Sequence, residues 1–320
     1  MMAQMNSEEW NPPKRIEQQY RSSLVLISNR IIKIFETTAN IEEFVRLAKE
    51  FSQDPQFIKY SYNIARRLVT QLHKNDSIKW KQMLKAKGKK WQANRHIAEF
   101  YIRRMDIEKA EFFNHSNEMY EAFMEYLQGG KGAFLEKKIQ QNAARIVTLP
   151  ADIANDVSGW VAQQAIRGVR AFEIAEEIQN WFPEYSHARA EMIARTEVST
   201  INTQITQMQS IDAGVNCYQW RASGGGSGDG RTRYSHKKFS GVIVFWDEAP
   251  APEDLFPMYT QEGVPYKNSL GHYHAGCCPN CRCVAMPIAY TDDLVFPVRV
   301  YRGGQIVKMG ERALNKLIGA

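Results

Sequence analysis

The chain has 320 residues, of which 44% are hydrophobic, and it carries a formal net charge of +6. A hydrophobic fraction of this size is normal for a globular protein, and the length favours two domains. No apolar run approaches the roughly 18 residues that a membrane-spanning helix needs, and the mild positive charge favours an acidic partner such as nucleic acid or an acidic protein face.

Residues 14 to about 210 are predicted to form one helix after another. Asn40 and Glu43 have the spacing of a capping box, in which the Asn side chain accepts a hydrogen bond from an orphan amide and the Glu side chain reaches back. Asp54 followed by Pro55 predicts a second helix start, because a carboxylate caps the first turn and proline needs no amide partner there.

The later part of the helical region is predicted to be interrupted. The segment 129–132 contains three glycines, which predict a break, and Pro150 predicts the start of a new helix. Apolar residues then recur at helical spacing, which predicts one buried stripe. These residues are Ala171, Ile174, Ala175, Ile178 and Phe182.

A basic stretch runs from Lys74 to His96, with eight lysines and arginines against one acid and with Trp80 and Trp91 interleaved. Such a helix could follow a phosphate backbone by counterion release. The alternative, which we favour, is a solvated helix face with both tryptophans in the core. The residues that would contact phosphates are Lys79, Lys81, Lys85, Lys89 and Lys90.

Beyond Gly214 the residues become β-branched and aromatic, and residues 215–220 and 242–246 are predicted to be strands. A glycine-rich loop, residues 224–230, lies between them, and residues 298–301 and 305–308 predict a hairpin. The predicted fold class is therefore α+β: a long multi-helix N-terminal part followed by a small β-rich C-terminal domain.

Between residues 272 and 283, four of the five cysteines lie beside two of the seven histidines. Thiolate and imidazole are the ligands that tetrahedral zinc prefers, so one structural zinc ion could staple the β-rich domain. A tight turn with free thiols and a disulfide knot are the alternatives, and the expected cytosolic location disfavours the disulfide. The candidate ligands are Cys278, Cys281 and Cys283, with His236 or His274 as the fourth and Cys277 as a substitute.

Several enzyme classes lack their required residues in this sequence. A zinc deaminase needs His-x-Glu, a phosphate loop needs Gly-Lys-Ser/Thr, and many serine hydrolases carry Gly-x-Ser-x-Gly, and none of these patterns occurs. A closed site with four protein ligands is structural, since catalysis needs an open position.

Four sequence features follow one another in order: Ala194-Arg-Thr-Glu197, Trp220, the Arg231-Thr-Arg-x-x-His236 step and Asn280-Cys-Arg-Cys283. Together they resemble the phage Mu F-like family of minor head proteins. The resemblance covers about residues 140 to 290. Two departures are the glycine loop 224–230, which looks like an insertion, and the Cys277-Cys278 pair before Asn280.

The resemblance implies a phage minor capsid (head morphogenesis) protein and not an enzyme, made in the host cytoplasm and located inside the capsid of the virion. It implies low copy number, association with the portal inside the procapsid, and assistance to head assembly and to DNA packaging or ejection. Expected partners are the portal protein, a scaffold or major capsid protein, and nonspecific double-stranded DNA, with no membrane. The family's histidine and cysteine pattern implies metal binding by His236, Cys281 and Cys283.

With this resemblance the chain divides into three predicted regions. Residues 1–140 are a helical arm or bundle, residues 141–213 are the helical start of the Mu F-like region, and residues 214–320 are the β-rich domain with the Cys/His cluster. Two other functions are open: a metal-dependent nuclease or phage-delivered effector that uses His236 and Asp247, and a zinc-stapled regulator that binds specific DNA.

Overall fold

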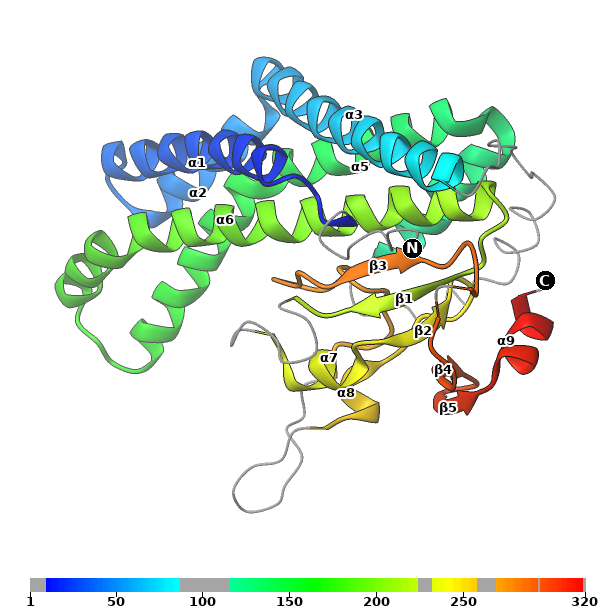
Figure 1. The fold of residues 1–320 in the computed structure, drawn as a ribbon. Helices are drawn as coiled ribbons and strands as arrows, with labels where there is room; N and C mark the ends of the chain where they lie inside the picture. Colours follow the sequence, from blue (N-terminus) through cyan, green and yellow to red (C-terminus); the bar gives the residue numbers. More distant parts are fainter. Residues whose placement is uncertain (1–9, 87–114, 224–231, 258–268, 293, 319–320) are drawn as a thin grey trace. The chain divides into compact units, whose positions relative to one another are not determined.

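The computed structural model describes residues 10–86, 115–223, 232–257, 269–292 and 294–318 (Figure 1). Its residues divide into two compact units that each combine separate segments of the chain. Unit 1 comprises Met1–Pro13, Gln71–Lys137 and Ser199–Ala320, and unit 2 comprises Lys14–Thr70 and Lys138–Val198. Within the described residues, none of the helices has the length and apolar character needed to span a membrane.

The long helices confirm the helical prediction for residues 14 to about 210. They are α1 (Lys14–Thr37), α2 (Ile41–Gln53), α3 (Pro55–Ala86), α5 (His115–Ile166) and α6 (Ala171–Asp212). The predicted starts are also confirmed, because Asn40 Oδ1 accepts from the Glu43 amide at 2.9 Å and Asp54 Oδ1 accepts from the Gln56 amide at 2.8 Å. Glu43 reaches back to the amide of Ala39, at 2.9 Å.

Two details of the helical prediction are wrong. Pro150 lies inside α5 and does not begin a new helix, whereas Gly130, with a φ of 75°, does interrupt the helical backbone as predicted. The stripe on α6 is only partly buried: Ile174, Ile178 and Phe182 are buried, but Ala171 and Ala175 are exposed. Proline inside a helix removes one backbone hydrogen bond, and at Pro150 the packing of the surrounding residues offsets that cost.

Unit 2 has an aromatic core and a buried polar network. Phe182 packs against Phe35 and Phe44, with ring centroids 4.6 and 5.6 Å apart. Glu197, of the predicted Ala-Arg-Thr-Glu motif, is buried and accepts hydrogen bonds from Asn142 and Arg145. Burying a carboxylate costs free energy unless it is hydrogen-bonded and paired, so these contacts give Glu197 a structural role in unit 2.

Unit 1 contains a five-stranded mixed sheet with the strand order β3-β1-β2-β4-β5. The strands are β1 (Cys217–Arg221), β2 (Val242–Phe245), β3 (Val284–Pro287), β4 (Val298–Arg302) and β5 (Gln305–Met309). Only β2 and β4 pair in parallel, and the other neighbours are antiparallel. Strands β1, β2 and the β4–β5 hairpin were predicted, whereas β3 was not.

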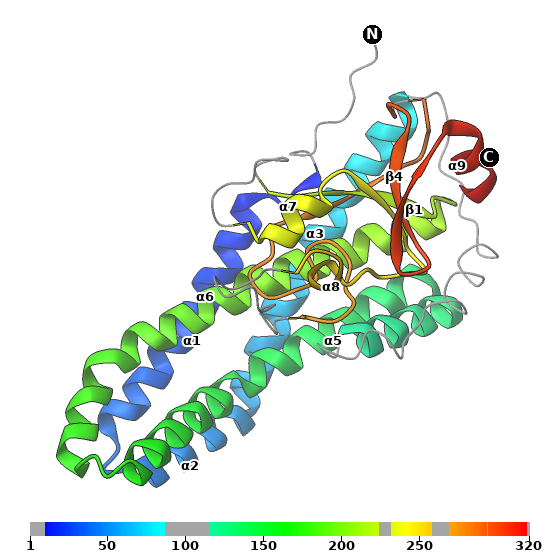
Figure 2. The ribbon, with the colours of Figure 1, turned by 90° about the horizontal axis from the view of Figure 1, so that it is seen from below.

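Three short helices accompany the sheet: α7 (Tyr234–Phe239), α8 (Pro252–Leu255) and α9 (Glu311–Ile318). Figure 2 shows α9 beside β4, and Leu314 of α9 is buried in one core cluster with Val298 and Val300. Helices α7 and α8 contact each other, which brings two segments with polar side chains together beside the sheet (Figure 1).

The last third of α6 forms the polar centre of unit 1. Every residue from Ser199 to Asp212 is buried, although most of them are polar. Thr203 donates to the carbonyl of Ala275 at 2.7 Å, and Gln207 donates to the carbonyl of Trp246 at 3.2 Å. Ala275 and Trp246 lie in loops that come before the cysteine cluster in the chain. These hydrogen bonds therefore hold both loops against α6.

A second core cluster joins distant parts of the chain in unit 1. Trp10 is 1% exposed and packs edge to face on Trp80, with ring centroids 5.7 Å apart. Val215 and Val284 complete the cluster. This burial confirms the expectation that Trp80 lies in the core, while Trp91 lies outside the described residues.

Replacing Asp76 with asparagine is expected to change how stability depends on pH. Burial raises the pKa of Asp76 to about 7, although Lys79 and a hydrogen bond from Thr206 oppose the rise. Folded Asp76 thus keeps a proton that the unfolded chain releases near pH 4, so wild-type stability falls between about pH 4 and 7, by at most about 1.4 kcal/mol per pH unit. Above pH 7 this loss is complete.

Urea unfolding of both proteins from pH 4 to 8 checks this expectation. The free energy of unfolding of Asp76→Asn minus that of wild type should increase from pH 4 to 7 and then stay constant, whether the difference at pH 4 is positive or negative. All other titrating groups are shared, so the difference isolates Asp76. Parallel profiles for the two proteins would contradict it.

Candidate metal centre

A tight turn places the sulfur atoms of Cys278 and Cys281 close together. The Cys281 amide donates to the Cys278 carbonyl at 3.0 Å, and Asn280 has a φ of 57°. Proline at the second position and a left-handed residue at the third are what a type II turn requires, and asparagine adopts that conformation more readily than most residues. The sequence Cys-Pro-Asn-Cys therefore specifies its own turn.

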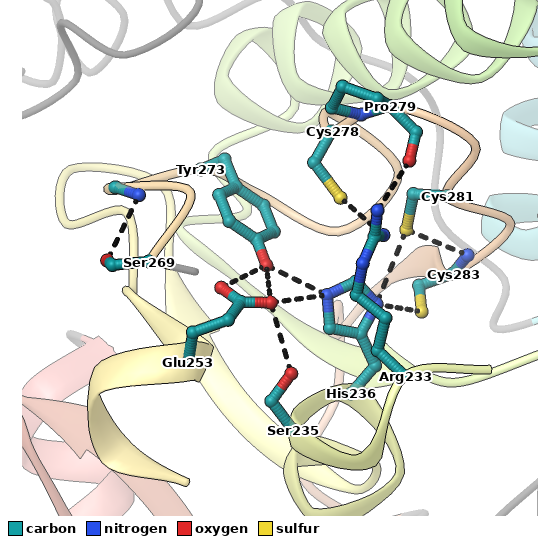
Figure 3. A network of polar contacts seen from close by, with 11 residues as sticks. Arg233, Ser235, His236, Glu253, Ser269, Tyr273, Cys278, Pro279, Cys281 and Cys283 are labelled. Carbon is teal, nitrogen blue, oxygen red and sulfur yellow. Dashed lines mark hydrogen bonds and ion pairs between the residues drawn. The ribbon is translucent and has the colours of Figure 1, made fainter. Parts of the chain in front are cut away.

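His236 brings an imidazole to this turn from α7. Its ring is 2% exposed, and Nδ1 lies 3.7 Å from the Cys281 sulfur and 3.3 Å from the Cys283 sulfur (Figure 3). Among the described residues, His236, Cys278 and Cys281 form a group whose donor atoms all lie within 4.8 Å of one another. Cys283 adds a fourth donor against the same nitrogen.

These distances match the chemistry of zinc. Zinc bonds of about 2.3 Å to sulfur and about 2.0 Å to nitrogen, at tetrahedral angles, separate the nitrogen from each sulfur by about 3.6 Å. The two measured separations from Nδ1, 3.7 and 3.3 Å, lie on either side of this value. His236, Cys278 and Cys281 therefore supply three donors for a tetrahedral ion, and Cys283, whose sulfur contacts the same nitrogen, is the candidate for the fourth.

The electrostatics of the cluster also suit a cation. Hydrogen bonds from Cys278 and Cys283 hold the pKa of Cys281 well below its ordinary value, which favours the thiolate form of this sulfur. Burial lowers the pKa of His236, but hydrogen bonds to Cys281 and Glu253 outweigh burial and raise it to about 9. A metal ion would replace the shared protons, as metal binding to thiols and imidazole does.

The groups around the sulfur atoms donate hydrogen bonds to them. Arg233 donates from Nη1 to the Cys278 sulfur at 3.4 Å and from Nη2 to the Pro279 carbonyl at 3.0 Å. The amide of Cys283 lies 3.4 Å from the Cys281 sulfur and donates to it. Such donors stabilise negative charge on the sulfur atoms.

Two predicted ligands lie outside this group. His274 is half-buried and packs against Tyr218 and Trp246; its Nδ1 is 3.1 Å from the Tyr218 hydroxyl, and desolvation lowers its pKa to about 4. Cys277 is buried but is not a member of the donor group. The distant His236, not the nearby His274, faces the thiols, and none of the five cysteines forms a disulfide in the described structure.

The basic stretch is only partly described. Lys79 is 6% exposed; its ammonium donates to the Asn11 carbonyl at 3.1 Å and lies over the Trp10 ring, so a phosphate backbone does not reach it. Lys81 is exposed. Lys85 lies in α3, and Lys89 and Lys90 lie outside the described residues.

Sequence reasoning missed Glu253 and Tyr273 as partners of the cluster. Glu253 lies in α8, within a proline-rich stretch that the sequence analysis did not assign to a helix. The signal was Pro252 at the first helical position with acids in the first turn, which marks a helix start. Tyr273 lies between the two histidines of the sequence cluster, where a ligand search passes over a phenol.

Comparison with known proteins gives one family match. Residues 155–286 match the family described as Phage Mu protein F like protein, and this range contains the whole donor group. An uncharacterized protein of Haemophilus influenzae is 28% identical over 154 residues, which are 48% of this chain and 29% of that protein. The match thus spans less than a third of that relative's length. No solved structure matches the chain.

Proposed function

We propose, from the premise that this chain carries a Phage Mu protein F-like domain over residues 155–286, that it is a minor protein of a phage head that acts in head morphogenesis. The single observation that carries this proposal is the family match. We further assign it to the interior of the capsid, at low copy and in association with the portal. It would there aid head assembly and DNA packaging or ejection, as the resemblance implies.

The proposal includes one structural zinc ion and no catalytic activity. Support comes from His236, Cys278 and Cys281, whose buried donor atoms lie within 4.8 Å of one another, and from the buried Cys283, whose sulfur lies 3.3 Å from Nδ1 of His236. A closed set of four protein ligands stabilises a fold, whereas a catalytic zinc keeps a position open for water or substrate. The small sheet of unit 1 would gain folding free energy from the ion.

The nuclease alternative receives little support from the contacts. His236 lies in the donor group, and Asp247 forms a two-pronged ion pair with Arg302, at 2.8 and 3.3 Å. Asp247 is also 9% exposed. A carboxylate held in this way is poorly placed to bind a catalytic metal or activate water.

Mass spectrometry of purified particles tests the proposal. Peptides of this chain should occur in full particles and in empty heads of the phage that encodes it, at a small fraction of the major capsid protein. Copurification of the portal after mild disruption of the heads would support the portal association. Clean absence from both kinds of particle would overturn the proposal and bring the nuclease and the regulator forward.

We expect any binding of this protein to double-stranded DNA to be independent of the DNA sequence. The exposed Lys81 and its neighbours in the basic stretch would supply phosphate contacts, and affinity should then fall steeply as salt rises. A gel-shift titration at two salt concentrations with unrelated duplexes measures this. Strong preference for one sequence would instead favour the zinc-stapled regulator.

A further inference from the structure

The two nitrogens of His236 face different surroundings (Figure 3). Nδ1 faces the sulfur atoms of Cys281 and Cys283, whereas Nε2 lies 2.8 Å from the Tyr273 hydroxyl and 3.4 Å from Glu253 Oε1. For Nδ1 to offer a lone pair to a metal, the ring proton must be on Nε2. The groups that contact Nε2 therefore decide whether His236 has the tautomer that can bind a metal through Nδ1.

Tyr273 and Glu253 provide an acceptor for that proton. The Tyr273 hydroxyl donates to the Glu253 carboxylate, with both oxygens at 2.7 Å, so its oxygen is left to accept from Nε2. Ser235 also donates to Glu253 Oε1, at 3.1 Å. The chain of hydrogen bonds runs from His236 through Tyr273 to a carboxylate held by a second hydroxyl.

Glu253 accepts hydrogen bonds from the hydroxyl groups of Tyr273 and Ser235, which fix its carboxylate 3.4 Å from Nε2 of His236. A carboxylate in this position favours the positive charge that a metal ion places on the imidazole. Arg233, which contacts the Cys278 sulfur, supplies a compensating positive charge in the same cluster.

We infer that Glu253, acting through Tyr273, is a positioning residue that sets the tautomer and orientation of His236 and thereby tunes metal affinity. This inference rests on the proposed metal site and assigns it a set of supporting residues from α7, α8 and the loop before the cysteines. Outer partners of this kind raise the basicity of a ligating imidazole, and their loss weakens metal binding about 10- to 100-fold.

The matched variants are Glu253→Gln and Asp254→Asn. Both remove one carboxylate charge from α8, but Asp254 is exposed and lies outside the hydrogen-bond chain. Zinc affinity of the purified full chain is measured by competition with a chromophoric chelator at fixed pH. We expect Glu253→Gln to bind one zinc ion per chain about 10- to 100-fold more weakly than wild type, with Asp254→Asn indistinguishable from wild type.

The absorption spectrum of bound cobalt(II) is a second measurement, and it would not change if Glu253 only stabilised the fold. Wild type and Asp254→Asn should give the same absorption bands of a tetrahedral site with sulfur ligands, and Glu253→Gln should shift them, because the imidazole is no longer held. Tyr273→Phe keeps the ring and removes only the hydroxyl, so it should reproduce the loss of affinity even if Glu253→Gln folds poorly.

The outcomes separate the two proposals. Zinc bound by wild type, with equal affinity and equal cobalt spectra in Glu253→Gln and Tyr273→Phe, would overturn the positioning role and leave the metal site standing. A wild type that binds neither zinc nor cobalt would overturn the metal site and the positioning role together.

Discussion

Cys281→Ser is expected to abolish tight zinc binding and to destabilise unit 1. Cys281 contributes the sulfur that contacts both His236 and the Cys283 amide, so a hydroxyl there removes a thiolate ligand from the centre of the cluster. An ion that binds only the folded state contributes about 4 kcal/mol when it is present at about 1,000 times its dissociation constant. Thermal unfolding with and without a chelator, together with zinc content per chain, measures the effect.

The control for this variant is Cys277→Ser, which changes a neighbouring buried cysteine outside the donor group. It should retain one zinc ion per chain and its sensitivity to chelator. Unfolding of wild-type protein at the same temperature with and without chelator would count against a structural ion. The sheet would then be stable through its apolar clusters alone.

Gly276→Ala is expected to destabilise unit 1 by about 3 kcal/mol or more, from backbone strain and overpacking together. Gly276 has a φ of 86°, and a Cβ there would lie 2.8 Å from the hydroxyls of Ser199 and Thr203 and 3.0 Å from the Cys283 carbonyl. The loop before the cysteines would have to move away from α6. Urea unfolding gives the loss of stability, and a zinc titration shows whether the cluster is displaced with the loop.

Gly304→Ala separates the two causes. Gly304 also has a positive φ, of 77°, but a Cβ there meets no atom within 4 Å. It should therefore cost only the backbone term, on the order of 1 kcal/mol. Equal losses in the two variants would show that the close approach of the loop to α6 contributes nothing to stability.

The parts of the fold that the sequence predicted are those with local causes. The Asn40 cap, the Asp54-Pro55 start and the β4–β5 hairpin each depend on a few neighbouring residues whose chemistry is specific to a cap or a turn. Strand β3 lacks such a signal, because its four residues follow the cysteines directly and pair with β1 far back in the chain. Local composition does not predict long-range strand pairing of this kind.

The choice of histidine shows the same limit within the site. His274 is four residues from Cys278, and His236 is far away, yet His236 faces the sulfur atoms while His274 contacts Tyr218. Spacing indicated the types of ligand and included Cys278 and Cys281, which lie in the donor group. It could not identify the imidazole, because that depends on where α7 lies against the loop, and the family resemblance supplied what spacing did not.

The segmented make-up of unit 1 has a consequence for its synthesis. Trp10 packs on Trp80, Val215 and Val284, so its buried place is assembled from residues that the ribosome adds about 70, 205 and 274 positions later. Until the strand that carries Val284 has been translated, this large aromatic side chain lacks part of its enclosure. The apolar side chain of Trp10 would thus stay partly exposed on the nascent chain through most of translation. Chaperones bind nascent proteins that expose apolar side chains in this way.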